Sequence, residues 1–370
     1  MKLRNPDALD FSYIPRKMFF RERQVSTLLA NVITPLRMGI TSNLALFGSS
    51  GTGKTSTVRF ILREEKGFLG IYENALSYSS LRGLMTDVLS RAGKIVQKNL
   101  GFPEIFRSLE RTLRMKQTNL LLVVDEATNL LKFDRAGLYN ILRAHELYGC
   151  PISTVIISME DPSIYMTERE RKSLGVFSTV LFDRYTRDEL SRIVEDRAAL
   201  AMNPEDIDPS VIDYICDLAE PFGSARVAIE LLQKATYMCM YRNGESISLE
   251  DARGARSMIS PYVTESKLAE LDRDELTVLL AICRSLRDDP STGIPDVISE
   301  MRSVSEESGT DIIDPGKVYR IVRRLENTGL IEGKIVGKGD RKGVGKMLGV
   351  NDIPVSVLEE KVSEILRRKR

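Results

Sequence analysis

The sequence predicts an α/β protein: a parallel β-sheet with helices on both faces, then a smaller helical domain, then a C-terminal domain of helices and one β-hairpin. Apolar runs of strand length alternate with helical segments through residues 1–183, which is the pattern of a parallel sheet. Residues 184–262 show helical patterns, and residues 268–370 show helical patterns followed by two short apolar stretches. A chain of 370 residues is long enough for these three domains.

Composition and charge narrow the classes of function. The net charge is +1, so any binding to nucleic acid must come from a local basic patch. The cysteines Cys150, Cys216, Cys239 and Cys283 form no CxxC pair, which argues against a zinc site or a disulfide framework and favours a reducing, cytoplasmic compartment. The single histidine, His145, argues against a His-based catalytic triad. The N-terminus lacks a long apolar h-region, and no apolar run reaches the roughly 18 residues of a membrane span, so neither export nor a membrane partner is expected.

The strongest motif is a glycine-rich loop between an apolar run, residues 44–47, and a helical segment that continues to Leu62. The loop fits the pattern GxxxxGK[ST], whose glycines turn backbone N–H groups onto phosphate while the helix N-terminus adds its dipole. The lysine of such a loop reaches the β- and γ-phosphates, and the next hydroxyl ligates Mg²⁺. The predicted nucleotide-binding residues are Gly48, Ser49, Ser50, Gly51, Thr52, Gly53, Lys54 and Thr55.

A second apolar run, residues 120–124, ends in the acidic pair Asp125 and Glu126. Continuous apolar runs are typical of central parallel strands. An acid at the carboxyl end of such a strand can hold the Mg²⁺ shell, and the next acid can orient an attacking water. We therefore predict Asp125 and Thr55 as the metal site and Glu126 as a catalytic residue. Further strands are predicted at residues 70–73, 152–158 and 179–182.

Two helix starts can be placed from their capping residues. Thr186 and Glu189 form a capping box that begins the helical region after the sheet. In the last domain, Asp314 suits the N-cap and Pro315 suits the first helical position. This helix is predicted to end at Gly329.

The helix that begins at Pro315 has two different faces at ~100° per residue. Its apolar face consists of Val318, Ile321, Val322 and Leu325. Its basic face consists of Lys317, Arg320, Arg323 and Arg324. The apolar face must pack on a core, which leaves the basic face available for phosphates.

The stretch VGKGDRKGVGK, residues 336–346, lies between two short apolar stretches and is predicted as the tip of a β-hairpin. Three helices and a hairpin form a winged helix-turn-helix, whose third helix enters the DNA major groove while the wing follows the backbone or a minor groove. Residues 315–350 carry nine Lys and Arg against three acids, a local charge of +6. A second phosphate loop is excluded because no GK[ST] occurs here, whereas disorder in the free protein and a solubilising loop stay open as alternatives. The predicted wing contacts are Lys338, Arg341, Lys342 and Lys346.

Over essentially its whole length the chain resembles the archaeal origin-recognition and cell-division-control initiators, the ORC-type branch of the AAA+ ATPases. The stretch DFSYIPRKMFFRERQVSTLLANVITPL is similar to the family's segment before the P-loop, and PFGSARVAIELLQKA is similar to its sensor-two motif. The resemblance implies an AAA+ core, a helical lid and a winged-helix domain. It also implies an adenine pocket around Tyr13, Ile14, Pro15 and Arg21, and a sensor-two arginine, Arg226, that reaches the γ-phosphate.

Two further segments resemble functional parts of this family. The stretch TERERKSLG is similar to the segment with the arginine finger, which implies Arg169, or alternatively Arg171, in that role; a solvated charge run is the other interpretation. Residues 93–113 correspond to the family's helical insertion, which contacts DNA, although ordinary surface charges are an equal alternative. The DNA-contact candidates in this insertion are Lys94, Lys98 and Arg107.

One departure from the family concerns the sensor-one asparagine. The corresponding strand ends VIISMEDPSIY and contains no asparagine, so Ser158 or Glu160 is the candidate substitute. The departure affects hydrolysis more than binding, and it predicts at most slow ATP hydrolysis.

The motifs and the resemblance together imply an ATP-dependent replication initiator that binds duplex origin DNA and helps recruit or load the replicative helicase. Its cofactors would be ATP or ADP with Mg²⁺. Its partners would include the helicase and a second copy or related initiator on DNA, in a nucleoid-associated location. The alternative is a DNA-binding regulatory or accessory AAA+ ATPase without helicase loading.

Overall fold

The computed structural model describes most of the chain, in two compact units. The described residues are 1–94, 100–127, 134–159, 161–162, 178–259, 268, 271–287, 289, 291–308, 313–328, 330–337, 344–350 and 355–368. The first unit comprises Leu3–Asn203 and Gly223–Ile229, and the second comprises Met1–Lys2, Pro204–Phe222 and Glu230–Arg370.

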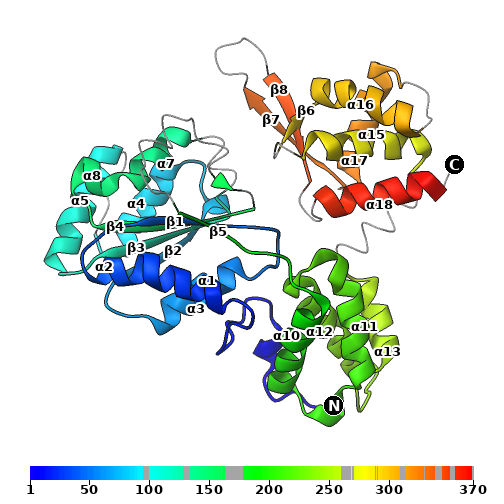
Figure 1. Cartoon of the computed structure of the whole chain (residues 1–370), viewed down its shortest axis with the longest axis horizontal. Helices are drawn as coiled ribbons and strands as arrows, with labels where there is room; N and C mark the ends of the chain where they lie inside the picture. Colours follow the sequence, from blue (N-terminus) through cyan, green and yellow to red (C-terminus); the bar gives the residue numbers. More distant parts are fainter. Residues whose placement is uncertain are drawn as a thin grey trace. The chain divides into compact units, whose positions relative to one another are not determined.

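The first unit is built on a five-stranded sheet with the strand order β2-β3-β4-β1-β5, in which every pairing is parallel (Figure 1). Its strands are β1 (Asn43–Phe47), β2 (Leu69–Asn74), β3 (Leu120–Asp125), β4 (Ile152–Ser158) and β5 (Ser178–Leu181). β3 and β4 are buried along their entire lengths, as continuous apolar runs predict. The predicted parallel sheet is thus confirmed.

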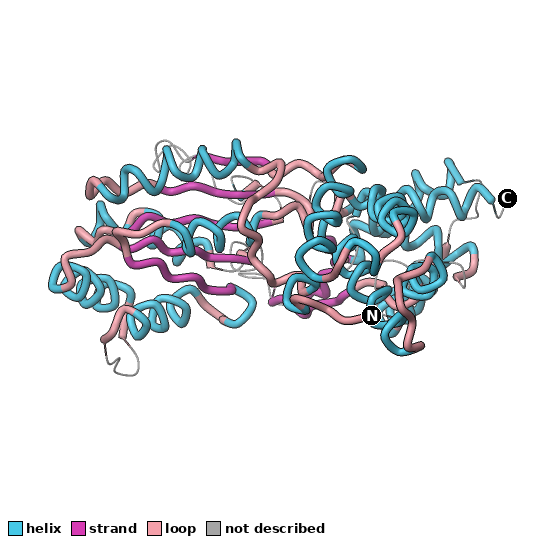
Figure 2. Tube along the Cα trace, turned by 90° about the horizontal axis from the view of Figure 1, so that it is seen from below, coloured by secondary structure: helices cyan, strands magenta, loops and turns pink. Residues whose placement is uncertain are grey.

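Helices cover both faces of this sheet (Figures 1 and 2). One face carries α1 (Glu22–Leu28), a π-helical turn (Leu29–Ile33), α2 (Thr34–Arg37) and α3 (Lys54–Glu64). The other face carries α4 (Leu81–Arg91), α5 (Phe102–Met115), α7 (Arg135–Leu142) and α8 (Ala144–Tyr148). Residues alternate between the two cores along each strand, so that Leu121 and Val123 pack in the core with α3, whereas Leu122 and Val124 pack in the core with α4 and α5.

The first unit also contains short 3₁₀ turns and the helix that follows β5. The turns are Pro6–Leu9 and Ala75–Ser77. The helix is α10 (Arg187–Ala201), and its predicted capping box is confirmed: the backbone N–H of Glu189 donates to Thr186 Oγ1, and the backbone N–H of Thr186 donates to the Glu189 carboxylate.

The second unit opens with a group of helices. These are a 3₁₀ turn (Pro204–Asp206), α11 (Pro209–Ala219), a 3₁₀ turn (Glu220–Phe222), α12 (Ala225–Tyr241) and α13 (Leu249–Arg256). The first residues of α12 belong to the first unit. Asp208 begins α11 by accepting a hydrogen bond from the backbone N–H of Ser210.

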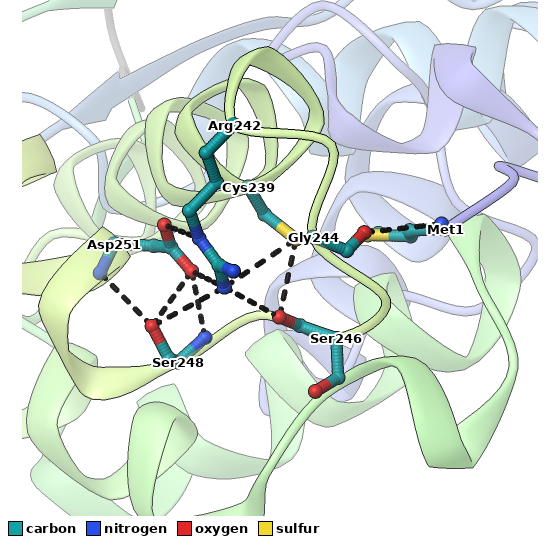
Figure 3. A network of polar contacts seen from close by, with 7 residues as sticks. All are labelled: Met1, Cys239, Arg242, Gly244, Ser246, Ser248 and Asp251. Atoms are coloured by element: carbon teal, nitrogen blue, oxygen red, sulfur yellow. Dashed lines mark hydrogen bonds and ion pairs between the residues drawn. The ribbon is translucent and has the colours of Figure 1, made fainter.

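A polar network closes the loop between α12 and α13 (Figure 3). Arg242 donates through Nε and Nη2 to the two carboxylate oxygens of Asp251, at 2.8 and 2.7 Å. Asp251 Oδ2 also accepts from the backbone N–H of Ser248 at 2.8 Å, within the box that caps α13. The other contacts of the network come from Met1, Cys239, Gly244 and Ser246.

The C-terminal part of the second unit is a winged helix. Its elements are α15 (Arg273–Ser285), β6 (Thr292–Gly293), α16 (Ile294–Ser308), α17 (Pro315–Asn327), β7 (Glu332–Gly337), β8 (Val344–Gly349) and α18 (Val355–Arg368). The antiparallel strand order is β6-β8-β7. The predicted helices and hairpin are confirmed; β6 was not predicted, because a two-residue strand leaves no periodic pattern.

The helix α17 has the predicted apolar face. Asp314 caps it by accepting from the backbone N–H groups of Gly316 and Lys317. The buried side chains are Val318, Ile321, Val322 and Leu325. The predicted helix end at Gly329 lies outside the described residues. Among the helices that are described, none combines the length and apolar character that crossing a membrane requires.

The Arg242–Asp251 pair predicts a pH dependence of stability. The hydrogen bond from Arg242 lowers the pKa of Asp251 from its usual 3.8 to about 2. The ionised carboxylate therefore stabilises the fold fully above about pH 4, and this contribution is lost as the pH falls toward 2. We expect Asp251→Asn to lower the free energy of unfolding by about 1–2 kcal/mol at pH 7, with the difference shrinking between pH 4 and pH 2. Urea denaturation across this range measures it.

The matched control is Glu250→Gln, which changes an exposed acid of the same helix. It should leave the free energy of unfolding nearly unchanged at both ends of the range. An Asp251→Asn effect that stayed constant from pH 7 to pH 2 would contradict the role assigned to the ion pair.

Candidate functional sites

The predicted P-loop joins the end of β1 to the start of α3, with glycines where the backbone requires them. Gly48, Gly51 and Gly53 have φ values of +141°, +77° and +91°. A Cβ on Gly51 would lie 1.9 Å from Ser224 Oγ, and a Cβ on Gly48 would lie 2.3 Å from the carbonyl oxygen of Phe182. Both backbone conformation and close packing therefore require glycine at these two positions.

Lys54, the first residue of α3, points back into the loop. Its side chain is buried, and its ammonium donates to the carbonyl oxygens of Gly48 at 2.6 Å and Ser49 at 2.7 Å. Burial lowers the pKa of Lys54 to about 8, and the carboxylates of Glu126 and Asp125 oppose this shift. The group thus keeps its charge at neutral pH in a place with little competing water, which suits it to binding phosphate.

Asp125 lies at the carboxyl end of β3 and is 2% exposed. Its Oδ2 accepts from Thr55 Oγ1 at 2.7 Å and from the Tyr72 hydroxyl at 2.5 Å, and its Oδ1 accepts from the backbone N–H of Glu126 at 2.8 Å. Burial and the Asp125 carboxylate raise the pKa of Tyr72. Sequence reasoning missed Tyr72, because its place beside Asp125 depends on which strand neighbours β3.

Thr55 and Asp125 fit a Mg²⁺ site. A hydroxyl oxygen and a carboxylate are the hard oxygen ligands that Mg²⁺ prefers, and it commonly joins them with phosphate oxygens. The hydrogen bond between the two side chains places these oxygens together at the start of α3. The two residues could therefore hold the metal that accompanies a nucleotide.

Glu126 follows Asp125 in a left-handed conformation, with φ of +53°. Part of the Glu126 side chain is exposed, but the surrounding protein still desolvates its carboxylate. This desolvation is the larger cause of the raised pKa of Glu126, and the negative charge of Asp125 is the second cause. The cations Lys54 and Arg226 oppose the shift. A carboxylate in this setting can accept a hydrogen bond from water, as the predicted catalytic role requires.

Arg226 lies beside the P-loop at the start of α12. The backbone N–H of Ala225 donates to the carbonyl oxygen of Gly51 at 3.0 Å. The guanidinium carbon of Arg226 lies 4.8 Å from the centroid of the Phe11 ring. The structure thus brings the predicted sensor-two arginine to the same place as the P-loop and Glu126.

Two arginines fix the segment predicted to line the adenine pocket. Arg63, on α3, donates to the carbonyl oxygens of Ile14 and Pro15, both at 2.8 Å. Arg197, on α10, donates to the carbonyl oxygen of Tyr13 at 3.0 Å and stacks on the Tyr13 ring at 4.7 Å. The segment is thereby tied to two helices of the first unit, and its contact with adenine stays a prediction.

Arg21 is buried and hydrogen-bonds to three main-chain carbonyl groups. Its guanidinium donates to the carbonyl oxygens of Thr52 at 2.9 Å, Asp183 at 2.7 Å and Phe20 at 2.7 Å. It also stacks on the Tyr185 ring at 3.8 Å. These contacts hold the P-loop against the end of β5, and a direct contact of Arg21 with adenine stays a prediction.

The predicted sensor-one position lies at the end of β4. Ser158 is buried there and pairs in register with Phe47, the last residue of β1. The next residue, Met159, accepts a hydrogen bond from the backbone N–H of Gly48 at 3.2 Å. Ser158 is therefore next to the start of the P-loop. The other predicted residues of this region, which lie outside the described residues, are Glu160, Arg169 and Arg171.

Two cations of the predicted DNA-binding face of α17 pair with acids at the start of α15. Lys317 pairs with Asp274, and Arg324 Nη1 lies 2.9 Å from Glu275 Oε1. The Glu275 side chain is 3% exposed, so loss of Arg324 would leave a buried charge unpaired. Sequence reasoning missed these ion pairs because the acids belong to another helix.

Arg320 and Arg323 remain exposed on the same helix, and neither forms an ion pair with another described residue. Tyr319 is 54% exposed. Because Arg323 lies four positions after Tyr319 and three positions after Arg320, the three side chains share one side of α17. This surface of two cations and one aromatic ring can contact phosphates and bases. Tyr319 was missed because it belongs to neither predicted face.

The base of the hairpin is fixed to α17. Lys346, on β8, pairs with Glu326 at 2.5 Å. A Cβ on Gly333 would lie 1.8 Å from Glu326 Oε1, so the glycine permits this close approach. Of the other predicted DNA contacts, the described Lys94 and Arg107 are exposed. Those outside the described residues are Lys98, Lys338, Arg341 and Lys342.

The fold and these sites define a P-loop protein of the AAA+ class with a lid and a C-terminal winged helix. Family models match three successive parts of the chain. Residues 41–161 match the AAA domain, residues 191–257 match the Cdc6 AAA+ ATPase-type lid domain, and residues 267–360 match the CDC6 C-terminal winged helix domain.

The chain belongs to the archaeal ORC1-type family of DNA replication proteins. It is 42% identical over 346 residues to the putative ORC1-type DNA replication protein 1 of Thermoplasma acidophilum, covering 94% of this chain and 99% of that protein. It is 27% identical over 386 residues to the ORC1-type DNA replication protein of Pyrococcus furiosus, covering 98% of this chain and 89% of that protein. The resemblance inferred from the motifs is confirmed.

Solved structures of the family share the fold. The crystal structure of Cdc6p from Pyrobaculum aerophilum superposes with a TM-score of 0.63 at 22% identity, covering 99% of each chain. The Aeropyrum pernix ORC1 protein in complex with DNA superposes with a TM-score of 0.65 at 25% identity, covering 100% of this chain and 99% of that chain.

The position of Lys54 generates a prediction about nucleotide affinity. Lys54→Met removes the buried ammonium, so we expect ATP to bind about 10- to 100-fold more weakly. Titration with a fluorescent ATP analogue measures this change. The control is Lys66→Met, an exposed lysine just beyond the same helix, and it should bind like the parent. Equal affinities of all three proteins would contradict the placement of the phosphate site.

Proposed function

We propose that this chain is a nucleotide-controlled replication initiator, which binds ATP or ADP with Mg²⁺ at the P-loop and duplex origin DNA at the winged helix. The observation that carries the proposal is the combination in one chain of the Lys54, Thr55 and Asp125 site with the exposed Arg320 and Arg323 of α17. The ORC1-type relatives and the similarity to an ORC1 protein in complex with DNA support it.

In this proposal each residue of the nucleotide site has a defined task. Lys54 and the backbone N–H groups at the start of α3 bind the phosphates, with the helix dipole adding to the attraction. Thr55 and Asp125 hold Mg²⁺, which when bound neutralises phosphate charge. Glu126 orients the attacking water, and Arg226 binds the γ-phosphate from the lid.

We infer slow hydrolysis at most, from the residue at the sensor-one position. Ser158 offers one hydroxyl where an asparagine would offer an amide on a longer side chain. A water or phosphate oxygen that needs this donor would therefore be held less well. The serine at the sensor-one position also favours the second candidate function, a DNA-binding regulatory or accessory ATPase without helicase loading. Steady-state phosphate release, measured with and without DNA, tests the slow hydrolysis that both candidate functions share.

At the DNA we propose that α17 enters the major groove with Tyr319, Arg320 and Arg323 toward the duplex. Lys317 and Arg324, which also pair with acids of α15 and stay partly exposed, would add phosphate contacts from the same helix. The wing, with Lys338, Arg341, Lys342 and Lys346, would follow the backbone, and the insertion would add further contacts. These insertion residues are Lys94, Lys98 and Arg107.

The remaining parts of the proposal concern the assembly. The initiator would help recruit or load the replicative helicase and would lie beside a second copy or a related initiator on DNA, in the nucleoid of the cytoplasm. In such a pair Arg169, or Arg171, would act on the neighbour's nucleotide. The domain limits proposed for this architecture are 1–183, 184–262 and 268–370.

The pairing pattern on α17 generates a prediction about DNA binding. Arg320→Gln with Arg323→Gln removes two exposed cations that can contact phosphates. We expect weaker duplex binding and a plot of log affinity against log salt that is flatter by roughly two units. Fluorescence anisotropy across a salt series measures both quantities.

The control for net charge is Arg253→Gln with Arg256→Gln, two exposed arginines of α13. It should leave the salt slope unchanged if α17 is the contact surface. If the α17 variant and the α13 variant lose affinity equally, only the overall charge matters, and the proposed docking of α17 is wrong.

A further inference from the structure

Tyr72 lies on β2, one strand away from the predicted metal-binding carboxylate. β2 and β3 are parallel neighbours, and Tyr72 pairs with Val123. Side chains two residues apart on a strand share a face of the sheet, so Asp125 and Val123 project to the same side. Val123 packs in the core under α3, and Tyr72 packs against that same core. The sheet register therefore places Tyr72 and Asp125 as diagonal neighbours on the face that also carries the P-loop helix.

The Tyr72 hydroxyl and Thr55 converge on a single oxygen of Asp125. Both donate to Oδ2, and the backbone N–H of Glu126 donates to Oδ1. Thr55 belongs to the P-loop, and Glu126 directly follows Asp125 in the chain. Tyr72 is the donor that comes from a separate strand, and so it is the one that fixes the carboxylate relative to the sheet.

Tyr72 is itself held on two sides. The guanidinium of Arg59, one helical turn after Thr55 on α3, lies 4.6 Å from the centroid of the Tyr72 ring. Arg91, on α4, donates to the carbonyl oxygen of Tyr72 at 2.6 Å. The ring and the backbone are thus both fixed, which leaves the hydroxyl little freedom to turn away from Asp125.

We propose that Tyr72 is a positioning residue for the metal: its hydroxyl holds the Asp125 carboxylate against Thr55, so that Mg²⁺ meets a carboxylate that is already oriented. The inference rests on the proposed binding of nucleotide with Mg²⁺. Hydrogen bonds to a metal-binding carboxylate restrict its rotation, and their loss typically weakens metal binding 10- to 100-fold. Tyr72 is expected to act through Asp125, without contact to the nucleotide.

The test is Tyr72→Phe, which keeps the ring and its contact with Arg59 and removes only the hydroxyl. Binding of a fluorescent ATP analogue is measured in EDTA and across a Mg²⁺ titration. We expect the affinity in EDTA to stay within about two-fold of the parent, because Lys54 and the P-loop backbone are unaltered. The Mg²⁺ concentration that produces half of the full increase in affinity for the ATP analogue should rise about 10-fold.

Two comparisons isolate the effect. Tyr78→Phe removes a hydroxyl that contacts Glu73 and Asp87 instead of Asp125, and it should leave the Mg²⁺ dependence unchanged. In an Asp125→Asn background, Tyr72→Phe should cause no further change, because the carboxylate through which it acts is gone.

Three results would overturn the inference. The first is an unchanged Mg²⁺ dependence in Tyr72→Phe. The second is an equal loss of affinity with and without Mg²⁺, which would show a structural role for the hydroxyl. The third is a parent protein whose affinity for the nucleotide does not change with Mg²⁺ concentration. This result would also overturn the proposed site for nucleotide and metal, and it can be recognised from the parent protein alone.

Discussion

The carboxylate of Asp125 is the point on which the nucleotide site depends. A parallel sheet brings the carboxyl ends of its strands to one edge, and a charge buried at that edge must be satisfied by donors. Here the donors come from the P-loop helix, from β2 and from the chain just after β3. The same hydrogen bonds that stabilise the buried charge thereby fix Thr55 and Tyr72 relative to each other.

Elsewhere in the first unit, three arginines hydrogen-bond to main-chain carbonyl groups of the P-loop and of the segment before α1. Arg21 binds the carbonyl oxygen of Thr52, Arg63 binds those of the segment before α1, and Arg197 binds the same segment from α10. Arginine suits this task because its planar guanidinium offers five donors and keeps its charge when buried. Three separate segments of the first unit are thus joined through main-chain carbonyls, whose positions are insensitive to side-chain substitution.

The sequence was sufficient for elements whose signal is local. The continuous apolar runs of β3 and β4, the capping box of Thr186 and the apolar face of α17 depend on neighbours within a few residues, and all are confirmed. The family resemblance rested on motifs of the same local kind. The partners of those motifs were not predictable in this way.

The contacts that could not be predicted from the sequence join segments that lie far apart in the chain. Tyr72 meets Asp125 only because β2 neighbours β3, and Arg324 meets Glu275 only because α17 packs beside α15. A basic helical face gives no sign of which cations are already paired. It therefore required the structure to show that Lys317 and Arg324 are paired, whereas Arg320 and Arg323 form no ion pair with any residue that the structure describes.

The most direct test of this account is a crystal structure of the chain with Mg²⁺ and a non-hydrolysable ATP analogue. The account predicts that the phosphates contact Lys54, that Mg²⁺ lies at Thr55 and Asp125, and that the Tyr72 hydroxyl still donates a hydrogen bond to Asp125 Oδ2. A metal bound elsewhere, or an Asp125 carboxylate turned away from Tyr72, would contradict it.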